Sequence, residues 1–393
     1  MTEIMQGFPV LPAQRIPHQD WDRAPWNRWS FQNVRQMLPT TEVWRGEGDI
    51  NHFAHQPKEL GSVQFKSTED TVDTVQNWIN TSYTDGILVL HQGSIVLEQY
   101  LNDMNPRSLH LSQSMAKSIV GCVAGILIGR GEMNPNALVS TYLPELEHTA
   151  WKGATLRHVL DMTTGVRYVE DYEALDSDIA LTDIASGWKQ PSPGVDAPDC
   201  MWDQIMGLVN TTRAHGELFQ YRSIETDVLA HCLERITQTQ LADLVSREIW
   251  QPLGCEESAC FTVDSAGYAL ACGGFNATLR DYARFGQMLL DEGQANGKNI
   301  VPKAWIDDIH NADNSLYTAP YTLTSPNGGY RNQFWKEDVD QKMFMARGVF
   351  GQLIYVDPAH DMVLVKLSSW PEFTSVPRLK DALNAIHGIA DAL

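Results

Sequence analysis

The sequence is poor in the features with which proteins bind nucleic acid or a membrane surface. It has 29 Lys and Arg against 49 Asp and Glu, a formal net charge of −20, and no run of three basic residues. Phosphate backbones are bound by clustered cations, and anionic lipid heads repel a negatively charged surface. We therefore expect neither a nucleic-acid partner nor a membrane partner.

Cysteine, long apolar runs and basic leader segments are also scarce. The six cysteines form no C-x-x-C pair, and H-E-x-x-H does not occur, so we expect no metal and no other cofactor. Residues 119–128 form the longest apolar stretch, which glycines interrupt and which is too short to span a bilayer. The first residues carry no basic segment followed by an apolar one, so we expect no signal peptide and a cytoplasmic protein.

What the sequence does contain is typical of a large globular protein, because 43% of its 393 residues are apolar. Apolar runs on either side of a Gly-containing turn predict a β-hairpin over 87–100, and two further strands are predicted over 349–356 and 362–367. Strands near both ends with helices between them predict an α/β (α+β) fold with one antiparallel sheet that is built from both termini and flanked by helices. We expect three parts: a wrapping segment over 1–60, a sheet domain over 61–110 and 270–393, and a mainly helical domain over 111–269.

Helical patterns account for much of the remaining chain. A buried helix is predicted over 114–130, where Gly121, Ala124 and Gly125 allow close packing. A Gly- and Pro-rich loop is predicted over 186–200. Further helices are predicted over 71–83, 155–162, 223–236, 241–250, 278–290 and 376–392.

The chemistry begins with Ser114-Met-Ala-Lys117 at the start of the buried helix. Residues three apart share a helix face, and a hydroxyl at a helix N-terminus lies where negative charge is favoured. Burial would lower the pKa of Lys117 and make its amine a base for a Ser114 nucleophile. The structural alternative, a serine N-cap beside a lysine that reaches solvent, stays open on local grounds.

Two further signals are weaker when taken singly. A second S-x-x-K, from Ser186 to Lys189, lies in the predicted loop without a buried helix, and we discount it. Tyr221, just before a predicted helix, could pass a proton to a leaving group. A half-buried core tyrosine beside an N-cap at Ser223 is the competing interpretation.

An ordered series of motifs resembles the serine β-lactamase/penicillin-binding-protein family, on its class C and esterase side. After the hairpin and S-x-x-K, the chain contains the series T155-L-R-H-V-L-D-M-T-T-G165, Y221-R-S223, P252-L-G254 and T278-L-R-D-Y-A-R-F-G286. The resemblance is closest to a branch that cleaves linear amides. It extends to A24-P-W-N-R-W-S-F31, to 170–172 and 186–188, and to V363-L-V-K-L-S-S-W-P371. It implies a β-lactamase/transpeptidase-like fold, with the active site between the sheet and the helical domain.

The resemblance also implies roles for individual residues. Ser114 would be the nucleophile, Lys117 its base, and Tyr221 the group that protonates the leaving atom. The backbone N–H groups of Ser114 and Val349 would form an oxyanion hole. Substrate contacts would come from six side chains: Tyr172 as a donor to the amide, Trp188 over the acyl chain, Asp183 for a terminal ammonium, and Cys272, Trp335 and Phe350. For Asp183, a solvated loop carboxylate remains an alternative.

Departures from the family pattern bear on the substrate. Ala346-Arg347-Gly348 stands where penicillin-processing relatives have K-T-G, and Phe350 and Cys272 stand where the amide-cleaving branch has His and Asn. We expect a serine hydrolase of linear amides, acting through an acyl-enzyme on a small-molecule amide or ester. A carboxylesterase for short acyl esters and a non-catalytic binding protein are the alternatives, as is Cys272 acting as the nucleophile. The sequence leaves a homodimer open.

Overall fold

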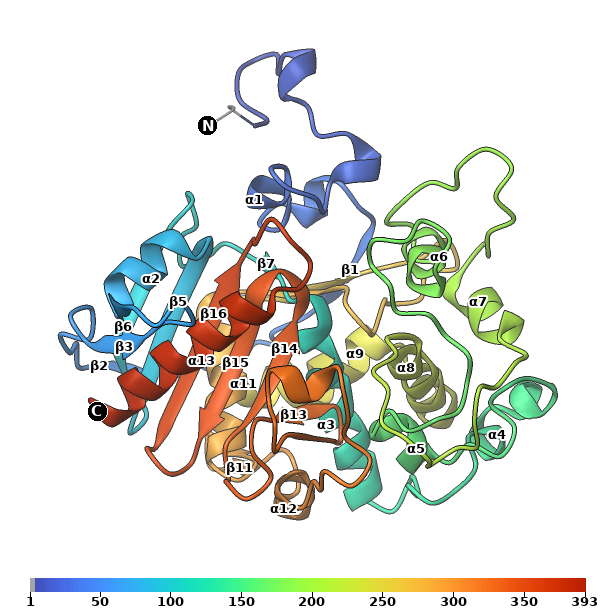
Figure 1. The fold of residues 1–393 in the computed structure, drawn as a ribbon. Coiled ribbons are helices and arrows are strands. Elements are labelled where there is room, and N and C mark those ends of the chain that lie inside the picture. Colours follow the sequence, from blue (N-terminus) through green and yellow to red (C-terminus); the bar gives the residue numbers. More distant parts are fainter. Residues whose placement is uncertain (1–3) are drawn as a thin grey trace.

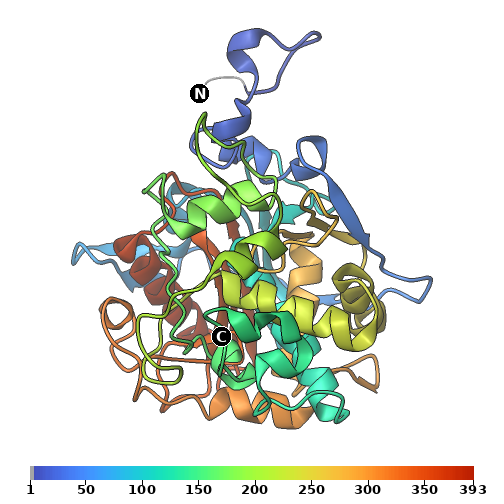
Figure 2. The ribbon, with the colours of Figure 1, turned by 90° about the vertical axis from the view of Figure 1, so that its right-hand side faces the viewer.

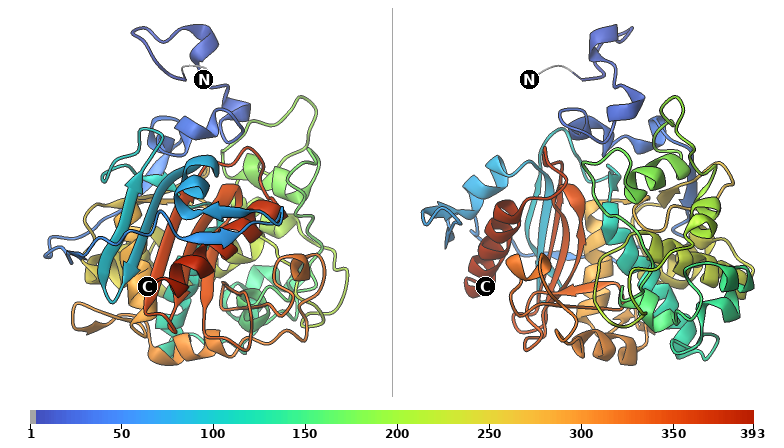
Figure 3. Two further views of the ribbon diagram at one scale, coloured as in Figure 1. Left: turned by 60° about the vertical axis from the view of Figure 1, so that its left-hand side comes forward. Right: turned by 45° about the vertical axis from the view of Figure 1, so that its right-hand side comes forward.

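The computed structural model describes residues 4–393 and is built around a large sheet with helices on both faces (Figure 1). Helices α13 and α2 cover one face, while α11 and the helical part of the chain lie on the other (Figure 3). The N-terminal segment lies across one end of the molecule, above the sheet and the helical part (Figure 2).

The main sheet has eight strands in the order β12-β13-β14-β15-β16-β5-β6-β2, all antiparallel except the pairing of β2 with β6. A second sheet, which the sequence did not predict, has the order β1-β8-β9-β7. The strands are β1 Thr40–Val43, β2 Ala54–His55, β3 Gln64–Lys66, β4 Val72–Thr74, β5 Thr84–His91, β6 Ser94–Tyr100, β7 His110–Leu111, β8 Ala259–Thr262, β9 Phe275–Ala277, β10 Gln294–Ala295, β11 Lys298–Asn299, β12 Gly329–Arg331, β13 Phe334–Lys336, β14 Phe344–Gly348, β15 Gln352–Asp357 and β16 Met362–Ser368.

The helices are concentrated in the middle of the chain, and several begin at a hydroxyl cap. Thr155, Ser177 and Thr278 each accept a backbone N–H at the start of a helix, which satisfies a donor that the helix itself cannot. The α-helices are α1 Asn27–Ser30, α2 Val75–Thr81, α3 Ala116–Gly129, α4 Val139–Tyr142, α5 Leu156–Leu160, α6 Asp178–Ala185, α7 Met201–Gly207, α8 Ile224–Thr237, α9 Leu241–Val245, α10 Gln251–Leu253, α11 Leu279–Leu290, α12 Lys303–His310 and α13 Val376–Asp391.

Strand β5 shows how the sheet divides the core into two layers. Ile87 and Val89 pack in the cluster that contains α13, whereas Leu88 and Leu90 pack in the cluster that contains α3 and α11. Successive side chains of a strand point to opposite faces. Because both faces are buried, β5 is apolar throughout its centre rather than alternating with polar residues.

The structure confirms most of the predicted elements and corrects three. The helix predicted over 71–83 begins only at Val75, because Val72–Thr74 form β4. The hairpin, the buried helix and the sheet drawn from both ends of the chain are present. Residues 349–351 form a turn between β14 and β15, so the single strand predicted over 349–356 is wrong at its start. The pairing of β2 also makes the sheet mixed rather than purely antiparallel. The domain boundaries stay a prediction.

Close packing of the buried helix explains its glycines. A Cβ on Gly125 would lie 2.4 Å from the Trp305 ring of α12, and one on Gly121 would lie 2.8 Å from the carbonyl oxygen of Asn332. The predicted role of these small residues is therefore confirmed. Within residues 4–393, no helix combines the length and the apolar character that crossing a membrane requires.

Candidate active site

Two pockets meet at Ser114, between the end of strand β14 and the helical part of the chain. The first, which we call the lid pocket, is lined by Asp22, Asp183, Trp188 and Lys189, among others. The second, the strand pocket, is lined by residues that include Tyr221, Trp335 and Arg347. Four residues line both pockets: Ser114, Tyr172, Val349 and Phe373. A chain-like molecule could therefore run from one pocket to the other across the Ser114 hydroxyl.

A tight turn presents Ser114 to these pockets. Residues Gln113–Met115 form a single 3-10 turn that leads directly into α3. Gln113 has a φ of +49°, a left-handed conformation that is uncommon for residues other than glycine. Gly348, at the end of β14, is so close that a Cβ there would lie 3.0 Å from the backbone nitrogen of Ser114. The end of β14 therefore packs directly against the backbone of the candidate nucleophile.

Lys117 points into the same site rather than out to solvent. Its Nζ donates to Ser114 Oγ at 2.8 Å, to Ser223 Oγ at 3.1 Å and to the carbonyl oxygen of Cys272 at 2.6 Å. The residue is only 1% exposed. The alternative of a lysine that reaches solvent is therefore excluded.

The charge state of Lys117 differs from the expectation. Burial acts to lower the pKa of Lys117, but the negative charges that Tyr221, Cys272 and Glu170 carry when ionised outweigh burial and raise it. Three acceptors around Nζ match the three donors of an ammonium group. The predicted lowering of this pKa is therefore wrong, because the sequence did not reveal the acceptors.

Tyr221 lies beside this pair, just before α8. Lys117 Nζ is 5.1 Å from the centroid of the Tyr221 ring, and the phenol interacts with both Ser114 and Lys117. Burial raises the pKa of Tyr221, although Lys117 opposes that shift, so the phenol is neutral at rest. Ser114, Lys117 and Tyr221 thus form one cluster, as the sequence predicted.

Glu170 and Ser223 connect the cluster to Tyr172, and neither was assigned a site role from the sequence. Glu170 accepts from the Ser223 hydroxyl at 2.5 Å, from the Ser223 backbone N–H at 2.8 Å and from the Tyr172 hydroxyl at 2.6 Å. Ser223 in turn accepts from Lys117. Glu170 lies 53 residues before Ser223 in the sequence, so their contact could be found only in the folded chain.

Cys272 contributes its backbone to the site more than its thiol. Its carbonyl oxygen accepts from Lys117, and its backbone N–H donates to Asp227 at 3.3 Å. Burial raises the pKa of the Cys272 thiol well above its ordinary value, and the thiol interacts with Asp227. Because a thiolate is the reactive form, this environment argues against Cys272 as the nucleophile.

The aromatic residues expected at the substrate are placed unequally. Trp335 stacks on Tyr221 with ring centroids 5.2 Å apart and lines the strand pocket. Trp188 lines the lid pocket, where its indole donates to Thr262 at 2.9 Å. Phe350 lines neither pocket: it is 1% exposed and packs against Phe31 and Phe373. The predicted substrate contact of Phe350 is wrong, because the turn after β14 directs its ring into the core.

Tyr172 lies at the junction of the two pockets, and its hydroxyl hydrogen already takes part in a hydrogen bond within the chain. The Tyr172 hydroxyl donates to Glu170, and its ring stacks on Phe373. The phenol oxygen is therefore placed to accept from a substrate N–H. The predicted donation from Tyr172 to a substrate amide is not the arrangement seen.

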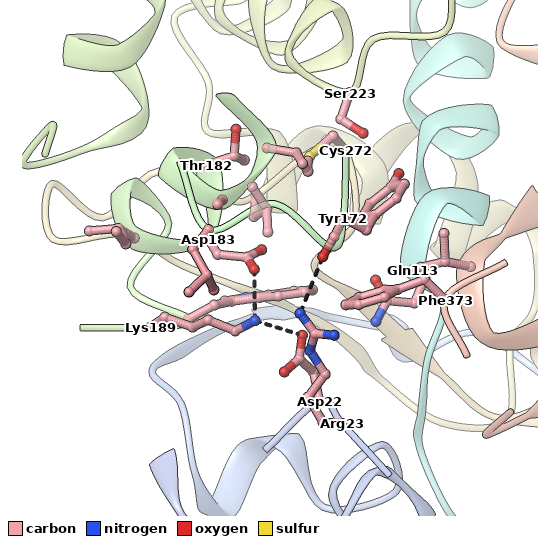
Figure 4. A pocket seen from close by; sticks show the side chains of 18 of the residues that line it. Asp22, Arg23, Gln113, Tyr172, Thr182, Asp183, Lys189, Ser223, Cys272 and Phe373 are labelled. Atoms are coloured by element: carbon pink, nitrogen blue, oxygen red, sulfur yellow. Dashed lines mark hydrogen bonds and ion pairs between the residues drawn. The ribbon is translucent and has the colours of Figure 1, made fainter. Parts of the chain in front are cut away.

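Asp183 lies in the lid pocket, but a cation of this chain already contacts it. Lys189 Nζ is 3.0 Å from Asp183 Oδ2 and 3.2 Å from Asp22 Oδ2 (Figure 4). Burial raises the pKa of Asp183 to about 6, against the opposing charge of Lys189. The idea of a solvated loop carboxylate is excluded, and the binding of a substrate ammonium by Asp183 stays a prediction.

The strand pocket contains a cation without such a partner. Arg347 lies over the Trp335 ring at 4.5 Å, and burial lowers the pKa of its guanidinium. Within the part of the chain that the structure describes, Arg347 makes no ion pair with a carboxylate. Residues 4–393 also contain no group of three or more His, Cys, Asp or Glu side chains arranged to hold a metal ion.

Comparisons with known proteins show the family to which the chain is similar. Residues 82–388 match the family model described as Beta-lactamase. The chain is 32% identical over 369 residues to 6-aminohexanoate-dimer hydrolase of Paenarthrobacter ureafaciens, covering 93% of this chain and 91% of the relative. It is 27% identical over 176 residues to Esterase EstB of Burkholderia gladioli, covering 42% of each chain.

A solved structure extends the similarity to the whole fold. The structure named "Putative 6-aminohexanoate-dimer hydrolase from Bacillus anthracis" superposes with a TM-score of 0.90 at 28% identity and covers 98% of both chains. The family model covers most of the sequence, and the first relative exceeds 30% identity over nearly its full length. The chain therefore belongs to the β-lactamase family and is a hydrolase with the fold of that family.

Proposed function

We propose that this chain is a serine hydrolase that cleaves linear amides of the 6-aminohexanoate type through an acyl-enzyme. The observation that carries the proposal is the hydrogen bond between Lys117 Nζ and Ser114 Oγ at the junction of two pockets. Similarity to 6-aminohexanoate-dimer hydrolase over 93% of the chain supports the substrate type.

In the proposed mechanism, the Ser114 hydroxyl attacks the amide carbon while its proton passes to the Lys117–Tyr221 pair. Negative charge on the former carbonyl oxygen would face the backbone N–H groups of Ser114 and Val349. The pair then returns the proton to the leaving nitrogen, and the C–N bond breaks. Water repeats the sequence on the ester and regenerates Ser114.

The two pockets take different halves of such a substrate. Tyr221 lines only the strand pocket, so the leaving amine belongs there and the acyl half lies in the lid pocket. In a 6-aminohexanoate chain the leaving half ends in a carboxylate. Arg347, which makes no ion pair with a carboxylate in the described chain although the charge of Glu337 acts on it, supports recognition of that carboxylate.

The linear dimer of 6-aminohexanoate and an analogue with a heptanoyl acyl half test this proposal. The wild type should release 6-aminohexanoate from at least one of them, and Ser114→Ala should release none above background. Lys303→Met, at an exposed ion pair far from the pockets, is the matched control and should retain wild-type turnover. Equal turnover by Ser114→Ala would rule out the assigned nucleophile.

A carboxylesterase for short acyl esters is the second candidate, which the partial match to Esterase EstB favours. Tyr172→Phe separates the two, because the phenol oxygen can accept an N–H that only an amide presents. An amide hydrolase should lose far more amide than ester cleavage in this variant. Equal losses of kcat/KM on a matched amide and ester would favour the esterase.

A further inference from the structure

The lid pocket contains a cation of its own at the place where an acyl chain would end. Lys189 follows Trp188 in the turn after α6, and its Nζ lies between Asp22 and Asp183 (Figure 4). The Lys189 side chain is 15% exposed and the Asp22 side chain 3%. This lysine belongs to the second S-x-x-K, whose spacing gave no indication of a role.

Several contacts fix the lysine in this position. The backbone N–H of Lys189 donates to the carbonyl oxygen of Asp183 at 3.0 Å. On the other side, Trp21 donates to the carbonyl oxygen of Trp188 at 3.0 Å, and the Gln19 side chain pairs with the backbone of Gln190. The backbone on both sides of Lys189 is thus fixed, and the two carboxylates hold its ammonium.

In this part of the pocket, Asp22 and Asp183 supply two carboxylates, and Lys189 is the cation that lies between them. Arg23 forms its ion pair with Glu173 and donates to the carbonyl oxygen of Tyr172, so it neutralises neither aspartate by direct contact. A substrate ammonium would have to displace Lys189 or lie beside it, where like charges repel.

We propose that Lys189 is a specificity-determining residue that occupies the cation position of the lid pocket, so that the enzyme selects acyl chains whose far end carries no ammonium. This inference rests on the proposed function and narrows its substrate class. The preferred substrates are linear amides with an uncharged acyl half and a leaving half that ends in a carboxylate. The free dimer of 6-aminohexanoate is then a poorer substrate than its uncharged analogue.

A matched pair of substrates tests the proposal. Heptanoyl-6-aminohexanoate replaces the terminal ammonium of the 6-aminohexanoate dimer by a methyl group of similar size. The wild type should give the higher kcat/KM on the heptanoyl substrate. Lys189→Met should shift the ratio of kcat/KM by about 10- to 100-fold towards the free dimer, as expected for a charge-assisted hydrogen bond to a vacated carboxylate.

Two further variants distinguish the effect of the positive charge at position 189 from a general loss of structure or activity. Lys189→Arg keeps the cation and should keep the wild-type ratio. Lys303→Met removes a lysine that pairs with two exposed carboxylates, Glu292 and Asp307, outside both pockets, and should also keep that ratio. A ratio in Lys189→Met equal to that of Lys303→Met would overturn the proposal.

If Lys189→Met does not fold, the preference of the wild type between the two substrates tests the proposal. A preference of the wild type for the free dimer by tenfold or more would overturn the proposal, because the methyl analogue has the hydrophobic advantage. If neither substrate is cleaved, the proposed function fails. Calorimetric binding of heptanoate and 6-aminohexanoate to the wild type then tests the pocket separately: tighter heptanoate supports the Lys189 proposal, and tighter 6-aminohexanoate contradicts it.

Discussion

The charge on Lys117 determines which group can accept the proton of Ser114. An ammonium that donates to Ser114, Ser223 and the Cys272 carbonyl has no lone pair to offer. The Lys117–Tyr221 pair must therefore lose one proton before it can act as a base. Because the two groups interact, the pKa that governs activity belongs to the pair and not to either residue.

The dependence of activity on pH follows from the direction of these shifts. The pKa values of Lys117 and Tyr221 are both raised, so the base form of the pair is a minor species at neutral pH. We expect kcat/KM to increase by about tenfold per pH unit below the pKa of the pair, and to keep increasing above pH 8. A pH profile measured from 6 to 10 checks this, and a plateau reached below pH 7 would show that the pair is already deprotonated.

A variant of Glu170 provides a second test of the protonation state of the Lys117–Tyr221 pair. Its negative charge raises the pKa of Lys117, so Glu170→Gln should move the increasing limb of the profile to lower pH. Glu217→Gln, at an exposed position, is the control and should leave the profile in place. If Glu170→Gln lowered kcat at every pH without moving the profile, Glu170 would have only a structural role.

At the scale of elements, the approach of β14 to the turn before α3 positions the reacting groups. Gly348 has a φ of −131°, so it is needed for space and not for backbone conformation. An added Cβ would lie 2.5 Å from the carbonyl oxygen of Ser112. The strand and the turn can stay in contact only if this position has no side chain.

Gly348→Ala should therefore separate the backbone of β14 from Ser114. We expect kcat/KM to fall by about 100-fold, because a displacement near 1 Å at a catalytic group has effects of that size. Gly48→Ala, where the added Cβ would meet nothing within 4 Å, is the control. Wild-type kinetics in Gly348→Ala would mean that the turn tolerates a wider gap and that this contact does not position Ser114.

Elements with strong local patterns were predictable, and those defined by long-range pairing were not. The helix over 114–130 and the hairpin over 87–100 follow from apolar periodicity and turn residues, and the structure has both. In the sheet β1-β8-β9-β7, the pairing of β1 with β8 joins residues more than 200 positions apart, for which the sequence carries no local signal. The turn at 349–351 was missed because Val349 and Phe350 are apolar like the strand that follows, and Phe350 is buried in the core.

The residues of the candidate site also divide into those that could be predicted from the sequence and those that could not. Ser114, Lys117 and Tyr221 were found because their motifs and order resemble a family. Glu170 and the Lys189 ion pairs were missed, because they join segments that are distant in the sequence: Glu170 contacts Ser223, and Lys189 contacts Asp22 of the N-terminal segment.

At the scale of the whole molecule, the N-terminal segment supports the lid pocket from outside. Trp21 is fully buried, and its ring lies edge-on to Trp188 with centroids 5.1 Å apart. Asp22 and Arg23 follow it directly and line the lid pocket. The expected wrapping segment is thus also part of the wall of the site. The cytoplasmic location and a homodimer stay predictions.

Trp21→Ala should affect stability and substrate binding together. Removing a buried tryptophan typically lowers the free energy of unfolding by about 3–5 kcal/mol. Phe8→Ala, at a fully exposed aromatic residue of the same segment, should change it by less than about 0.5 kcal/mol. Urea unfolding of both variants checks this, and equal stabilities would mean that Trp21 does not pack against Trp188 in solution.

The central claim is that Ser114 forms a covalent ester with the acyl half of the substrate. The most direct measurement is peptide mass spectrometry of the wild type mixed with a heptanoyl ester of p-nitrophenol and quenched in acid during turnover. We predict a heptanoyl adduct on Ser114, and none at that position in Ser114→Ala. Turnover with no adduct, or an adduct on Cys272 or another residue, would contradict the account.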